Sequence, residues 1–147
     1  MTRRRSYPIF LKEIICFLFI FLFSYAAISK LLDYSLFKIQ LGQSPLLTAF
    51  AGWVAWVIPS IELITVIMLV IPKLKLVALY GCLSLMSLFT WYIFAILNFS
   101  EYVPCSCGGI LDKLGWQEHL VLNISFIILA IIGILIPAPT LKHIHYI

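Results

Sequence analysis

Four long runs of apolar residues constrain the fold of this chain more than any other feature. The runs cover residues 14–32, 46–71, 76–97 and 118–136. Each is close to the ~20 residues that an α-helix needs to cross the hydrocarbon core of a bilayer. A soluble domain cannot hide the surface of a chain that is 63% hydrophobic and only 11% charged. We therefore predict an all-α polytopic membrane protein, in which residues 1–147 form a single four-helix transmembrane bundle.

The residues before and after the first apolar run indicate how the chain enters the membrane and where a short additional helix forms. The connector at residues 33–42 carries Tyr34, Phe37 and Leu41 at helical spacing, so we expect a short helix in the membrane interface. The basic head at residues 3–5, followed by an apolar run, also resembles a cleaved signal peptide. We expect an uncleaved signal-anchor helix instead, because the bundle needs this span.

Lysine and arginine are distributed unequally between the two sides of such a bundle. Seven of the ten lie at the termini or in the turn between the second and third spans: Arg3, Arg4, Arg5, Lys12, Lys73, Lys75 and Lys142. The other three, Lys30, Lys38 and Lys113, lie on the opposite side. The positive-inside rule therefore predicts cytoplasmic termini and an outward loop at residues 98–117. In a bacterial inner membrane this loop would face the oxidising periplasm. The net charge of +4 then reflects topology, and we expect no nucleic-acid partner.

The outward loop contains two cysteines, Cys105 and Cys107, separated by one residue. A disulfide between them would close a very small ring, which removes little entropy from the unfolded chain and strains the bond. A strained disulfide exchanges readily, so this spacing favours thiol–disulfide exchange. A structural or intermolecular disulfide stays open as an alternative. A metal site that includes His119 is also open, although the spacing matches no standard zinc pattern.

The start of the fourth span places two polar side chains on one helical face. Trp116, His119 and Asn123 follow the spacing i, i+3, i+7. His119 near a dithiol is a candidate general base that takes the proton from an attacking thiol. The alternative is a histidine that only forms hydrogen bonds at the membrane interface.

Two ionisable residues inside the apolar runs predict a polar cluster within the bundle. Glu62 lies in the middle of the second span, where a carboxyl group is costly unless it is paired or protonated. Lys30, near the outer end of the first span, can reach inward to it, and Asn123 can add a hydrogen bond. Such a cluster either moves protons, holds a polar headgroup, or simply joins the helices.

Two further cysteines, Cys16 and Cys82, lie in the cytoplasmic halves of the first and third spans. They are about 20 Å from the outer pair by helical rise, which is too far for direct exchange. We expect both to behave as small buried hydrophobic residues.

Taken together, these residues resemble the MauE-like branch of the DoxX-like membrane proteins, a family connected with methylamine utilisation. The shared features are Ile28-Ser29-Lys30-Leu31 with Asp33, Pro59-Ser60-Ile61-Glu62, Cys105-Ser106-Cys107-Gly108-Gly109, and the later Trp116, His119 and Asn123. The resemblance covers residues 14–136. It implies a four-helix inner-membrane bundle with outward cysteines. It also implies a role similar to that of a maturation factor for a disulfide-rich periplasmic enzyme subunit, acting with a thioredoxin-like partner. By that analogy Cys105 and Cys107 are the exchanging pair.

Three functions follow as hypotheses. The first is a thiol–disulfide redox factor of the inner membrane in which Cys105, Cys107 and His119 react with a cysteine-containing periplasmic partner. The second is a non-enzymatic accessory subunit of a larger membrane complex. The third is a lipid- or quinone-binding protein that uses Glu62 and Asn123. The sequence carries no quinone signature, so the cofactor stays unknown, and both a quinone and a second thiol protein are open as electron acceptors.

Overall fold

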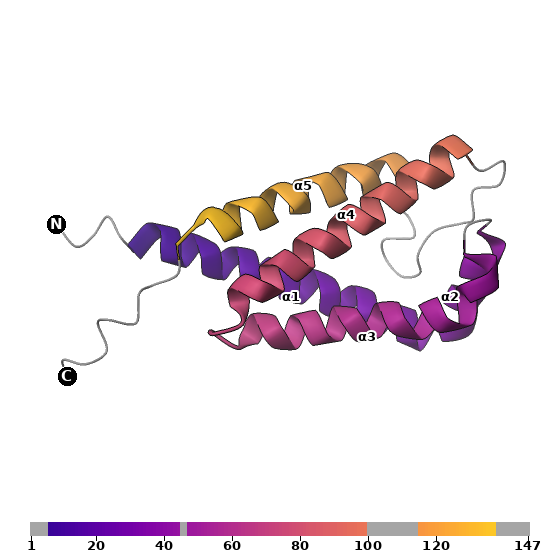
Figure 1. The fold of residues 1–147 in the computed structure, drawn as a ribbon, viewed down its shortest axis with the longest axis horizontal. Helices are drawn as coiled ribbons and strands as arrows, with labels where there is room; N and C mark the ends of the chain where they lie inside the picture. The colour runs from indigo at the N-terminus through magenta and orange to yellow at the C-terminus, as the bar shows by residue number, and fades with distance from the viewer. Residues whose placement is uncertain (1–5, 45–46, 100–114, 138–147) are drawn as a thin grey trace.

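The structure, a computed structural model, describes residues 6–44, 47–99 and 115–137 of the chain. Every regular element within these ranges is a helix, as Figure 1 shows. The elements in chain order are α1 (Ser6–Leu32), α2 (Tyr34–Gln43), the 3₁₀-helix η2 (Thr48–Phe50), α3 (Ala51–Val70), α4 (Lys75–Phe99) and α5 (Trp116–Leu135). Four segments are long and apolar enough to cross a membrane. They lie in α1, in η2 together with α3, in α4 and in α5. The predicted all-α, four-span membrane fold is therefore confirmed.

The four long helices are arranged as two pairs. Helix α1 packs mainly against α3, and α4 packs mainly against α5 (Figure 1). The pairs converge at the end of the molecule where α1 begins, α3 turns into α4, and α5 ends. They separate toward the other end, where α2 lies against α3. The pairs therefore separate at the end of the bundle that the sequence predicts to face outward.

Two clusters of buried side chains hold the helices together. The larger cluster joins α1, α3, α4 and α5 around Phe19, Phe23 and Leu79, all at most 1% exposed. The smaller cluster joins α2 to α3 through Phe37 and Ala55. Many other large apolar side chains are exposed, as expected for helices whose outer faces contact lipid hydrocarbon.

The helix ends differ in part from the predicted spans. Helix α1 begins at Ser6, well before the predicted start at residue 14. Its charged residues are paired with the other helices: Lys12 donates to the Ile136 carbonyl at 3.0 Å, and Lys75 donates to the Glu13 carboxylate at 2.5 Å. Lys12 and Glu13 precede the apolar run that begins at residue 14, and they are helical because other helices supply their partners. Helix α2 matches the helix predicted in the connector, whereas its position in the membrane interface stays a prediction.

Hydroxyl groups within the long helices are satisfied locally. Each of the following donates to the carbonyl four residues earlier in its own helix: Ser60, Thr65, Ser84, Thr90 and Ser125. This is the usual solution where water cannot reach the backbone. These hydroxyls therefore place no demand on neighbouring helices, unlike the ionised groups described next.

Candidate functional site

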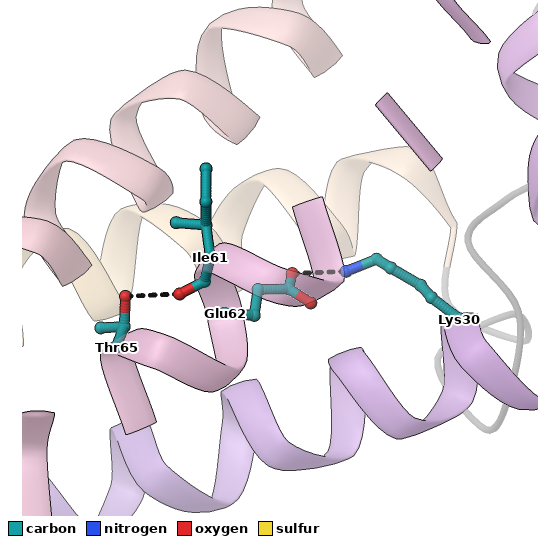
Figure 2. Close-up of polar contacts among 4 residues, drawn as sticks. All are labelled: Lys30, Ile61, Glu62 and Thr65. Atoms are coloured by element: carbon teal, nitrogen blue, oxygen red, sulfur yellow. Dashed lines mark hydrogen bonds and ion pairs between the residues drawn. The ribbon is translucent and has the colours of Figure 1, made fainter. Parts of the chain in front are cut away.

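The ion pair that the sequence predicts between Lys30 and Glu62 is present in the structure. Lys30 lies in the last turn of α1, and Glu62 follows Pro59, the proline inside α3. The Lys30 Nζ is 2.5 Å from Glu62 Oε1, and Figure 2 shows the two side chains extended toward each other. The Glu62 side chain is fully buried and that of Lys30 is 12% exposed. Because a lone carboxylate is very costly in this setting, the ammonium group is needed to keep it ionised.

The other carboxylate oxygen of Glu62 is not satisfied in the same way. Glu62 Oε2 is buried and has no hydrogen-bond partner among the described residues. A buried acceptor without a donor costs about 1–3 kcal/mol. Neighbouring Thr65 does not supply one, because its hydroxyl donates to the Ile61 carbonyl (Figure 2). The ion pair therefore leaves one buried carboxylate oxygen of Glu62 unsatisfied among the described residues.

Two aromatic rings complete the surroundings of the lysine. The Lys30 Nζ lies 5.9 Å from the ring centroid of Phe37 in α2 and 5.4 Å from that of Phe89 in α4. Both distances suit cation–π attraction, which strengthens when the cation is removed from water. Lys30 thus interacts with three other helices, and its ammonium position is well defined.

The ion pair lies in the wall of a cavity of about 440 Å³ between the two helix pairs. All five α-helices contribute to its lining. Most lining atoms belong to apolar side chains, and the polar or charged lining residues are Tyr25, Lys30, Gln40, Glu62, Tyr92, His119 and Asn123. Sites for small molecules usually combine this kind of apolar wall with a few polar groups, at volumes of roughly 300–1,000 Å³.

The two polar residues predicted on one face of the last span both line this cavity. His119 is half-buried and Asn123 is 8% exposed. They come from α5, so they approach the cavity from the helix pair opposite Glu62. Trp116 begins α5, but its side chain lies outside the described part of the structure.

The cysteines divide into two groups. Cys105 and Cys107 lie outside the described residues, so their predicted role as an exchanging pair stays a prediction. Cys16 and Cys82 are free thiols, 2% and 0% exposed, within the larger apolar cluster. Neither of these two lines the cavity, and their predicted burial is confirmed. Within the described residues no group of three His, Cys, Asp or Glu side chains is arranged to bind a metal.

Several cavity residues were missed by the sequence analysis. Tyr25 lies on α1, Gln40 on α2, and Phe89 and Tyr92 on α4. Phe89 and Tyr92 are spaced i, i+3 with Met86, which also lines the cavity. Phe94 places an aromatic ring on another face of the same helix, so this spacing alone did not single out the cavity face. Gln40 had no comparable signal, because its contribution depends on how α2 folds back over α3.

Four of the apolar side chains that line the cavity are also exposed on the surface of the bundle. Val57 and Ile61 of α3 and Leu88 and Trp91 of α4 line the cavity, and they are 37% to 61% exposed. In membrane-spanning helices, exposed apolar side chains face lipid. These residues therefore bring the cavity lining to the surface of α3 and α4 that is expected to face the hydrocarbon layer.

The fold and this site together define a class: a multi-pass helical membrane protein whose bundle encloses a largely apolar pocket with a buried ion pair in its wall. The family model described as Methylamine utilisation protein MauE matches residues 9–136. The chain therefore belongs to the MauE family. Comparison with curated proteins and with solved structures gives no match.

Proposed function

We propose that this protein is a thiol–disulfide exchange factor of the bacterial inner membrane, with Cys105 and Cys107 as its reactive pair. The observation that carries the proposal is that the family match spans both cysteines, whose spacing is poorly suited to a structural disulfide. The charge distribution supports an outward position for the loop that holds them. The role is that of an accessory factor, which acts on another protein in the context of methylamine utilisation that the family description names.

The proposed reaction is a two-step exchange with a periplasmic partner of the thioredoxin type. One thiolate of the pair attacks a disulfide of the partner and forms a mixed disulfide, which releases one partner thiolate. The second cysteine then attacks the mixed disulfide and releases the other partner thiolate. Cys105 and Cys107 are thereby oxidised, the partner gains two electrons, and the two thiol protons end on the partner's thiols; the reverse sequence oxidises the partner. His119 is proposed as the base that removes a thiol proton.

Trapping of the mixed disulfide tests this proposal. Replacing only one cysteine prevents the second step. Either Cys107→Ala or Cys105→Ala is therefore expected to accumulate a mixed disulfide with the partner, which a reducing agent cleaves. Cys16→Ala and Cys82→Ala are matched controls, because both thiols are buried away from the cavity, and neither is expected to trap anything. If neither single variant captures a partner, and the redox state of the pair never changes in cells, the proposal is wrong.

A further inference from the structure

The proposed thiol exchange gives no role to the cavity between the helix pairs or to the Glu62 carboxylate in its wall. A cavity of about 440 Å³ contains a buried carboxylate, and Glu62 Oε2 lacks a donor among the described residues. We propose that this cavity binds the headgroup of a membrane quinone, and that a hydroxyl of its quinol form donates a hydrogen bond to Glu62 Oε2. This inference concerns binding inside the bundle and does not depend on the cysteine loop.

Access to the cavity selects for a ligand that travels in the hydrocarbon layer. The lining residues Val57, Ile61, Leu88 and Trp91 are exposed on α3 and α4, so the mouth that we infer lies between these two helices, on the surface expected to face lipid. A water-soluble metabolite would have to cross apolar surface to arrive there, at a high desolvation cost. A quinone instead keeps its isoprenoid tail in the lipid while its ring enters between the helices.

The charges of the site disfavour anionic phospholipids. Among the described residues of the lining, Lys30 is the only lysine, and it already forms the pair with Glu62. An anionic phosphate headgroup would be placed beside the Glu62 carboxylate, and the described lining holds no second lysine or arginine to compensate it, which is unfavourable. An acyl chain alone offers no donor for Glu62 Oε2. A neutral headgroup with a hydroxyl avoids both problems.

Water alone is a poor occupant of this space. At ~30 Å³ per molecule, filling a cavity of about 440 Å³ would need about 15 waters, and each needs 2–4 polar partners. Most of the lining is apolar. A mainly organic occupant satisfies the apolar wall and the carboxylate together.

The lining also suits a flat ring with two oxygens. Tyr25, Phe37, Phe89 and Tyr92 provide aromatic surfaces from three helices, and ring–ring contacts are favourable in stacked or edge-on arrangements. Asn123, on the helix pair opposite Glu62, has an amide that can donate to a second ring oxygen. A quinol has two oxygens on opposite sides of its ring, so it can contact both walls at once.

Equilibrium binding of decylubiquinol and decylubiquinone to the full chain tests the inference. The protein is placed in phosphatidylcholine nanodiscs under anaerobic conditions, and bound ligand is measured after separation from empty nanodiscs. Saturable binding at one site per chain is expected. Glu62→Gln is expected to weaken decylubiquinol binding about tenfold, because it replaces a charge-assisted hydrogen bond by a neutral one. Decylubiquinone, which offers no hydroxyl, should respond less.

A pair of matched variants guards against an effect of Glu62→Gln on folding. Ile61 lines the cavity and Ile64 does not, although both are exposed isoleucines on α3, 41% and 55% exposed. Ile61→Trp is expected to block the mouth and abolish binding, whereas Ile64→Trp should bind like the native chain. The inference is overturned if the native chain shows no saturable binding, or if the two tryptophan variants bind equally.

The cysteine-free chain separates this inference from the proposed function. Cys105→Ser combined with Cys107→Ser should retain decylubiquinol binding, because neither residue is among the cavity residues that carry the argument. Retained binding with no mixed-disulfide trapping would refute thiol exchange alone. Trapping with no saturable quinol binding would refute the cavity assignment alone.

Discussion

At the scale of single residues, two ion pairs of the same length have very different surroundings. Lys30–Glu62 and Lys75–Glu13 both join nitrogen and oxygen at 2.5 Å. The Glu62 side chain is fully buried, whereas that of Glu13 is 53% exposed. Solvent screens the exposed pair, so its removal changes stability little. Removing one partner of the buried pair leaves a charge that nothing compensates.

Lys30→Met is therefore expected to lower the free energy of unfolding by about 3–5 kcal/mol, because Glu62 is left buried without its cation. Glu13→Gln, the control at the exposed pair, should cost less than about 1 kcal/mol. Unfolding of the purified variants in mixed micelles, followed by circular dichroism, gives both values.

The double variant Lys30→Met with Glu62→Leu is expected to recover most of the loss, because a buried pair can often be replaced by apolar groups at little cost. Similar losses for Lys30→Met and Glu13→Gln would contradict the difference in burial. So would a double variant as unstable as Lys30→Met.

Much of this pair was predictable from sequence. Glu62 and Lys30 are the ionisable residues within the second run and near the end of the first, and a buried charge needs a partner. The unsatisfied Glu62 Oε2 was not predictable, because it depends on which groups surround the carboxylate in space. The contacts of Lys30 with Phe37 and Phe89 were also missed, since they require the packing of three helices.

At the scale of helices, hydropathy locates the spans but not their ends. Helix α1 has 27 residues, a length of about 40 Å at 1.5 Å per residue, which exceeds the ~30 Å hydrocarbon core. Its additional turns carry Lys12 and Glu13, which a hydropathy criterion excludes. They are helical because the neighbouring helices supply their partners, and such contacts cannot be read from one segment alone.

Close approach of α5 to α1 and α4 depends on a glycine. A Cβ added at Gly133 would lie 3.3 Å from side-chain carbons of both Ile15 and Leu79. Gly133→Leu is expected to force these helices apart and to lower the free energy of unfolding by about 1–3 kcal/mol. The same micelle unfolding measurement checks this value.

The control for this prediction is Gly52→Leu in α3. There the nearest atom to an added Cβ is a carbon of the flexible Lys38 side chain at 3.7 Å. Gly52 is also exposed, so its replacement should change stability little. If Gly52→Leu destabilised the protein as much as Gly133→Leu, close packing of α5 would not be the cause.

At the scale of the whole molecule, composition predicted the class but not the pairing of helices. The four runs indicate four spans, yet many arrangements of four spans satisfy the same hydropathy. The observed pairs, α1 with α3 and α4 with α5, separate toward one end and create the cavity there. That shape depends on side-chain volumes at many contacts, so sequence reasoning identified Glu62, His119 and Asn123 as polar without predicting a pocket that joins them.

The orientation of the bundle determines whether its two proposed sites can serve a periplasmic partner. The distribution of basic residues predicts that Lys73, in the turn between α3 and α4, faces the cytoplasm, and that Cys107 faces outward. In intact spheroplasts a membrane-impermeant maleimide is expected to label Cys107 when the other native cysteines are replaced by serine. Lys73→Cys in a chain with no other cysteine should be labelled only after the membrane is opened. The reverse pattern would place the dithiol in the reducing cytoplasm, where a disulfide at Cys105 and Cys107 would not persist, and thiol exchange with a periplasmic protein would be impossible in either direction.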